Sequence, residues 1–207
     1  MPRPPTGRRS ARAFFALLAL ALACAAVVRA ADVPAWRVRE GDLRVLVPLK
    51  PGGAFEARST AVSGTLTAGA ARPLPVGGEL ALDLASIDTG IALRNEHLRE
   101  KYLQVAKGPG FDRAVLTSIV VRDAGGADFE GQSPFTGTLL LHGVSHPVSG
   151  TVQVRRVAQG ARVEASFPLV LTDHAIEPPM YLGVGVAAKV MVKVTFIAEP
   201  ATRAAGQ

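Results

Sequence analysis

The residues of this sequence that could do chemistry are few, and the histidines come first: His97, His142, His146 and His174. His142 and His146 are four positions apart, and on a helix such a pair would face one metal ion. Gly143 and Pro147 disfavour a helix at this place, so a shared zinc ion would need an unusual turn geometry. The sequence therefore predicts no metal site and places these histidines at strand ends.

Catalytic pairs are equally scarce. Asp173 precedes His174 at the end of an expected strand, but adjacent residues of a strand point to opposite faces and rarely act together. The sequence contains no G-x-S-x-G motif, no phosphate-binding loop and no dinucleotide fingerprint. We therefore expect a protein that is not an enzyme and that requires no cofactor.

Basic residues accompany the one segment with helical periodicity, and they are Arg94, His97, Arg99 and Lys101. The guanidinium group presents a fixed fork of donors that suits phosphate oxygens. Arg94, His97 and Arg99 could therefore hold the head group of a long apolar ligand. The alternative is a solvated helix face, because two glutamates are interleaved with the basic residues. The sequence leaves both interpretations open.

The first thirty residues differ from the rest of the chain. Four arginines form a basic start, an apolar run follows over 13–28, and Val28 and Ala30 stand at the positions that a signal peptidase recognises. The run is short for a membrane-spanning helix, which needs about 20 residues. We expect a signal peptide over residues 1–30, cleaved near Ala30, and a periplasmic or secreted protein. Sec or Tat export, an uncleaved anchor and lipidation of Cys24 stay open.

The charge balance changes when this segment is set aside. The chain has 23 Lys and Arg and 17 Asp and Glu residues, and 5 of the basic but none of the acidic ones lie in residues 1–30. The other residues carry a formal net charge of +1, which offers no clustered positive charge for nucleic acid. The single cysteine also lies in the segment, so residues 31–207 can form no disulfide. Their length fits one domain, and we expect no stable membrane span after removal of the signal peptide.

Short runs of alternating apolar and polar residues, separated by Gly and Pro, are typical of half-buried strands. Strands are expected near residues 35–39, 42–49, 55–67, 76–86, 112–122, 128–141, 147–157, 161–172 and 184–198. The last is the clearest, because Val190, Val192 and Val194 share one face while Lys189 and Lys193 lie on the other. One dry and one wet face are what a sheet closed around an interior requires.

One segment, residues 95–106, has helical periodicity instead. Leu98, Tyr102 and Val105 form one apolar stripe, Asn95 is placed to cap the start, and a Gly-Pro-Gly sequence follows the end. The pattern predicts a single short helix that closes one end of the sheet structure.

Four stretches, in this order, carry a resemblance to a known family. Residues 86–90 (SIDTG) match an S-I-x-T-G stretch, and residues 94–98 (RNEHL) match R-D-x-H-L with Asn in place of Asp. Residues 143–148 (GVSHPV) match G-V-[TS]-[KH]-P-V, and residues 171–176 (LTDHAI) are similar to R-x-D-[FWY]-G-I. Residues 35–198 as a whole therefore resemble the YceI-like family.

The resemblance implies an exported, all-β protein: an extended antiparallel lipocalin-like β-barrel of about eight strands that holds a polyisoprenoid or isoprenoid quinone in its lumen. A barrel of this size can hold one small ligand. The residues expected to line the lumen are Leu82, Leu84, Leu98, Tyr102, Phe135, Leu139, Phe167, Leu169, Val190, Val192 and Val194. The expected partner is a hydrophobic small molecule, for storage, transport or stress-related handling, and the sequence leaves a homodimer open.

Other functions stay open at this point. A plain interaction module would have a solid core and no lipid ligand. An electron-transfer partner would carry a quinone whose absorbance changes on reduction. An enzyme would need a convergent polar cluster, which the sequence does not show.

Overall fold

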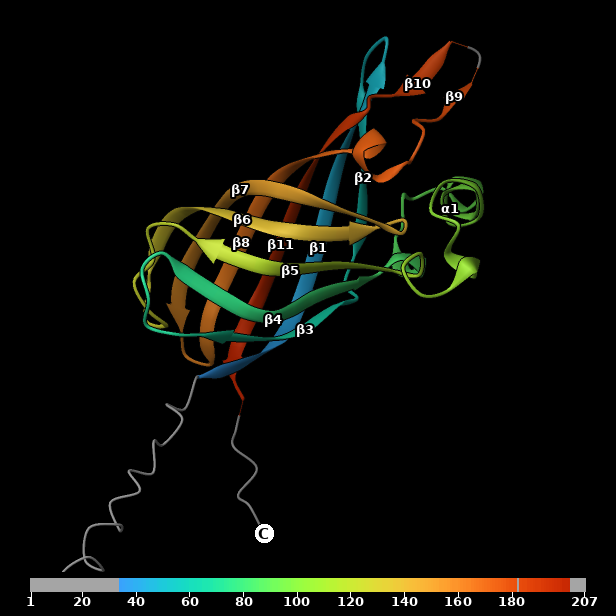
Figure 1. Cartoon of the computed structure of the whole chain (residues 1–207). Helices are drawn as coiled ribbons and strands as arrows, with labels where there is room; N and C mark the ends of the chain where they lie inside the picture. Colours follow the sequence, from blue (N-terminus) through green and yellow to red (C-terminus); the bar gives the residue numbers. More distant parts are fainter. Residues whose placement is uncertain (1–33, 182, 202–207) are drawn as a thin grey trace, which may run out of the picture. The chain divides into compact units, whose positions relative to one another are not determined.

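The computed structural model describes residues 34–181 and 183–201, so the predicted signal peptide lies outside the described residues. Eight strands close an antiparallel barrel, each paired with the next in this order: β1 (Ala35–Lys50), β3 (Val62–Ala68), β4 (Leu74–Asp83), β5 (Arg113–Val121), β6 (Gly131–Leu141), β7 (Val144–Val157), β8 (Gly160–Val170) and β11 (Lys189–Pro200) (Figure 1). The ring closes because β11 pairs with β1. The predicted all-β, lipocalin-like barrel is confirmed.

The remaining elements gather at one end of the barrel (Figure 1). They are β2 (Ala54–Ser59), β9 (Met180–Tyr181), β10 (Val184–Val186), the α-helix α1 (Ala92–His97), the π-helical turn η2 (Leu98–Tyr102), and the 3-10 turns η1 (Leu84–Ser86), η3 (Val105–Lys107) and η4 (Leu171–His174). Strand β2 pairs with β1, and β10 pairs with both β1 and β9. Among the residues that the structure describes, no helix is long and apolar enough to cross a bilayer.

Several predicted strand boundaries were wrong. Residues 35–39 and 42–49 form the single strand β1, which continues through a bulge where Glu40 has a positive φ of 49°. The predicted strand 55–67 is divided into β2 and β3, which pair with different stretches of β1. The predicted strand 184–198 is divided into β10 and β11, because β10 pairs with β9 and the end of β1 whereas β11 pairs with β8.

The predicted helix over residues 95–106 is composite and begins earlier. The α-helix starts at Ala92, and a π-turn follows in which the amide of Leu103 donates to the carbonyl of Leu98 at 2.8 Å. Asn95 is therefore inside the helix and does not cap it. Its side chain forms hydrogen bonds with Thr89 and Asp88 of the preceding loop instead. One short helix at one end of the barrel is confirmed.

The strands bury alternate residues, because successive side chains point to opposite faces. On β6 the inward residues run from Ser133 to Leu141, and the alternation is unbroken. Two of these inward positions differ in what surrounds them. Phe135 is packed among other side chains, whereas Leu139 faces open space in the lumen.

Candidate ligand-binding site

A cavity of about 930 Å³ occupies the half of the barrel next to α1, three residues of which line it. Its outer end is formed by apolar side chains that are largely exposed: Ile91, Leu93, Met180 and Val184. Ligand pockets commonly measure about 300–1,000 Å³ and are lined mainly by apolar groups. The cavity is therefore large enough for an extended organic ligand.

The walls of the cavity come from inward residues near one end of each contributing strand. Strand β1 gives Leu43, Val45 and Val47, and β11 gives Val190, Val192 and Val194. Because β11 and β1 are neighbours in the ring, these six residues form a continuous apolar wall. Helix α1 and the turn η2 supply the wall beside the opening.

The structure places ten of the eleven predicted lumen residues in the cavity lining. They are Leu82, Leu84, Leu98, Tyr102, Leu139, Phe167, Leu169, Val190, Val192 and Val194. The residues come from β4, η1, η2, β6, β8 and β11, so segments distant in sequence converge on one space. Whether they contact a ligand stays a prediction.

Phe135 is the exception, because it does not line the cavity. Its side chain is buried, with 3% of its surface exposed, and its ring packs edge-to-face against Phe167 with the ring centroids 6.0 Å apart. Phe167 itself borders the cavity. Phe135 therefore lies behind the lining, one layer deeper in the barrel.

The basic residues beside the opening form only part of the predicted rim. Arg94 and His97 line the cavity, and the guanidinium group of Arg94 lies over the ring of Phe55, 4.1 Å from its centroid. Arg99 does not line the cavity; its Nε atom is buried without a hydrogen-bond partner among the described residues. Lys101 lines the cavity instead.

The SIDTG stretch holds this helical segment in place. The side-chain oxygen of Asn95 accepts from the amide and hydroxyl of Thr89, at 2.8 and 2.7 Å, and its amide donates to Asp88 at 2.7 Å. Asp88 also accepts from the amide of Gly90, whose φ of 78° suits glycine. The Asn95 bond, followed by the Gly90 amide, lowers the pKa of Asp88. The backbone of Asp88 pairs in turn with Arg58 of β2.

Three of the histidines, His142, His146 and His174, lie close together and do not line the cavity. His174, in η4, is fully buried; its Nδ1 donates to the carbonyl of Val144 at 3.1 Å, and burial lowers its pKa. His142 donates to the carbonyl of His174 at 3.1 Å. His146 lies 3.9 Å from the carboxylate of the exposed Asp173. Among the described residues, no group of three or more potential ligands could hold a metal ion.

A closed antiparallel barrel with one apolar cavity at its helical end defines a hollow, lipocalin-like barrel. The family model of the YceI-like domain matches residues 46–198, and the chain belongs to this family. No curated protein matches the chain in sequence.

Solved structures have the same fold. A polyisoprenoid binding domain from Saccharophagus degradans is 17% identical, with a TM-score of 0.60 over 82% of this chain and 99% of that one. BcnA from Burkholderia cenocepacia is also 17% identical, with a TM-score of 0.58 over 75% of this chain and 96% of that one. The YceI protein of Campylobacter jejuni is 15% identical, with a TM-score of 0.50 over 70% of this chain and 85% of that one.

Proposed function

We propose that the protein is an exported, non-enzymatic binding protein that encloses a long hydrophobic ligand, a polyisoprenoid or an isoprenoid quinone, in its lumen. The observation that carries this proposal is the apolar cavity of about 930 Å³, walled by Val, Leu and Ala of the barrel strands. The Saccharophagus degradans domain, which has the same fold, is described as polyisoprenoid binding, and this supports the proposed ligand class.

Burial provides the affinity. A polyprenyl chain offers no hydrogen bonds, so binding must come from apolar surface removed from water. Enclosing about twenty methylene equivalents gives roughly 16 kcal/mol, against about 4–15 kcal/mol for association and chain ordering. The difference is compatible with micromolar or tighter binding.

The polar residues of the lining favour one orientation of the ligand. The basic residues that line the cavity are Arg94, His97 and Lys101, and none of the described lining residues is an aspartate or a glutamate. All three belong to the helical segment beside the opening. We therefore place a head group with acceptor oxygens at the opening and the hydrocarbon tail in the barrel.

Two alternatives make different predictions. An interaction module with a solid core is disfavoured by the cavity, and it would purify without lipid. An electron-transfer partner would use the same cavity for a quinone, and the purified protein would change its absorbance on reduction. The cargo would then be redox-active, while the chain would still perform no catalysis of its own.

Mass spectrometry of an organic extract of the purified protein tests the ligand. We expect an isoprenoid lipid in stoichiometric amount, and its absence from protein purified without detergent would contradict the proposal. Export is tested by the intact mass of the exported chain. A mass that begins near Ala31 is expected, whereas a mass that retains Met1, or one with a diacylglyceryl group on Cys24, would refute this export route.

A further inference from the structure

We propose that Phe167 is the floor of the lumen and sets the length of the hydrophobic tail that the protein accepts. This inference rests on the proposed function, because it concerns the ligand of the same cavity. It assigns a role in selectivity to one side chain, and it follows from where the cavity ends on each strand.

The cavity stops at about the same depth all around the barrel. The innermost lining residues of five strands are Leu43 of β1, Leu116 of β5, Leu139 of β6, Phe167 of β8 and Val194 of β11. Deeper inward residues on four of these strands, β1, β5, β6 and β11, are buried but do not line the cavity: Val38, Ile119, Phe135 and Phe196. Strand β7 contributes no residue to the lining. Beyond this depth the interior of the barrel is filled.

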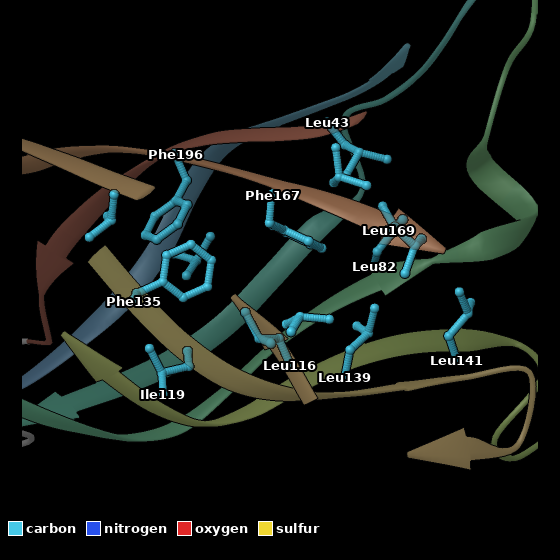
Figure 2. Packing of buried hydrophobic residues seen from close by; sticks show 14 of the residues in the cluster. Leu43, Leu82, Leu116, Ile119, Phe135, Leu139, Leu141, Phe167, Leu169 and Phe196 are labelled. Atoms are coloured by element: carbon cyan, nitrogen blue, oxygen red, sulfur yellow. The ribbon is translucent and has the colours of Figure 1, made fainter. Parts of the chain in front are cut away.

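Aromatic side chains form the boundary. Figure 2 shows Phe135 and Phe196 on one side of the cluster and Leu139 and Leu169 toward the other, with Phe167 between them. Of the three phenylalanines, only Phe167 borders the cavity, and the ring of Phe135 supports it from behind. Phe167 is thus the side chain that the end of a fully inserted tail would meet.

Gly150 of β7 fixes the position of this floor. It pairs with Phe135 of β6, and a Cβ atom placed on it would lie 2.6 Å from the Cβ of Phe167. The missing side chain therefore leaves the space in which the two rings meet across β7. The floor is held by backbone geometry as well as by packing, so a tail cannot easily displace it.

A fixed floor gives a defined dependence of affinity on tail length. Each buried methylene group increases the affinity about fourfold. The gain should continue as the tail grows and should stop once the tail reaches Phe167, because further carbons stay outside or force the chain to fold back. Linear prenyl alcohols that differ by one isoprene unit are suitable probes.

The experiment measures the affinity of each alcohol for lipid-free protein and for four variants. Phe167→Leu and Phe167→Ala should move the limit to longer tails, with a gain of about tenfold for the first alcohol beyond the wild-type limit. Leu169→Phe places a ring on the same face about 7 Å nearer the opening and should shorten the limit. Phe196→Leu is the matched control, because Phe196 is buried but does not line the cavity.

The outcomes separate this inference from the proposed function. If no alcohol binds the wild type, the proposed function fails. If alcohols bind with a length limit that the Phe167 and Leu169 variants leave in place, the floor is wrongly assigned while lipid binding stands. A shift in Phe196→Leu equal to that in Phe167→Leu would also overturn the assignment. Melting of each lipid-free variant confirms folding, and Leu169→Phe keeps the test decisive should Phe167→Ala not fold.

Discussion

The two halves of the barrel are built from the same strands but have opposite interiors. On β6, Phe135 and Leu139 point to the same side four residues apart, yet one is packed among aromatic rings and the other faces a cavity. On β11, Phe196 belongs to the filled half, and Val190 and Val192 belong to the hollow half. The strand pattern is identical in both, so alternation alone does not decide which half is hollow.

This difference divides stability and function between the halves. Close-packed interiors supply dispersion contacts on every side, while a residue beside a cavity loses part of them. We therefore expect the filled half to hold the barrel together and the hollow half to tolerate change. The following predictions test this division, from the largest expected effect to the smallest.

Phe135→Ala should have the largest effect. It removes a ring from the filled half, and Phe-to-Ala changes in cores cost about 3–5 kcal/mol of the free energy of unfolding. Leu139→Ala, on the same face of β6, is the matched change in the hollow half and should cost about 2 kcal/mol, at the low end for a buried leucine. Urea unfolding of the lipid-free proteins measures both, and equal costs would refute the division.

Two valines allow a substitution of identical chemistry in both halves. Val152 and Val192 are 6% and 5% exposed, but only Val192 lines the cavity. Val152→Trp overpacks a filled interior and should cost about 1–3 kcal/mol or more. Val192→Trp should leave the melting temperature of the lipid-free protein almost unchanged and reduce the bound lipid. A Val192→Trp protein with a melting temperature as low as that of the Val152→Trp protein would show that the lumen is not open.

Acid should weaken the hollow half through His174, which lies in the η4 turn against the cavity wall. Burial lowers the pKa of His174 in the folded protein, so between its folded value and about 6.5 the unfolded chain binds more protons. The stability that neutral, buried His174 contributes to the folded protein is fully present above about pH 6.5 and is lost as the pH falls toward the folded pKa. His174→Phe should flatten this part of the stability curve, measured by urea unfolding at several pH values. A pH dependence of stability that persists in His174→Phe would show that another group causes it.

The outer wall should matter least. Lys193 of β11 and Glu164 of β8 form an ion pair at 3.0 Å, and the bond from Lys193 lowers the pKa of Glu164. The pair is well exposed, so Glu164→Gln should cost at most about 1 kcal/mol and less at high salt. Bound lipid should not change. A change in lipid content would contradict the view that the two faces of the wall act independently.

Much of the barrel could be predicted from residue alternation, but its depth could not. Alternation tells which face a side chain points to, and it placed Leu82, Phe167 and Val192 inward. It cannot tell how far along the barrel a residue lies, so Phe135 was grouped with the lumen. That assignment depends on how neighbouring strands are staggered, which brings Gly150 beside Phe167.

The helical segment shows a second limit. The apolar stripe of Leu98 and Tyr102 was placed correctly beside the cavity, since helical spacing depends only on local sequence. The start of the helix was not, because Asn95 has a tertiary role: it bonds Thr89 and Asp88 of the preceding loop. A capping residue and a residue that bonds a loop have the same side-chain chemistry, and the sequence does not separate them.

The pairing of β1 with β11 has a consequence for the order of events during synthesis. Residues 36–46 hydrogen-bond to residues 191–200, so the ring cannot close until the last strand of the barrel has left the ribosome. Contacts between such distant segments slow folding, because a long loop must be ordered first. Until then the apolar faces that will line the lumen are exposed to water, and the edges of β1 and β11 lack their pairing partner. The chain therefore has a long interval in which a translocation machinery or a chaperone can hold it unfolded, and the interval ends with a single closure.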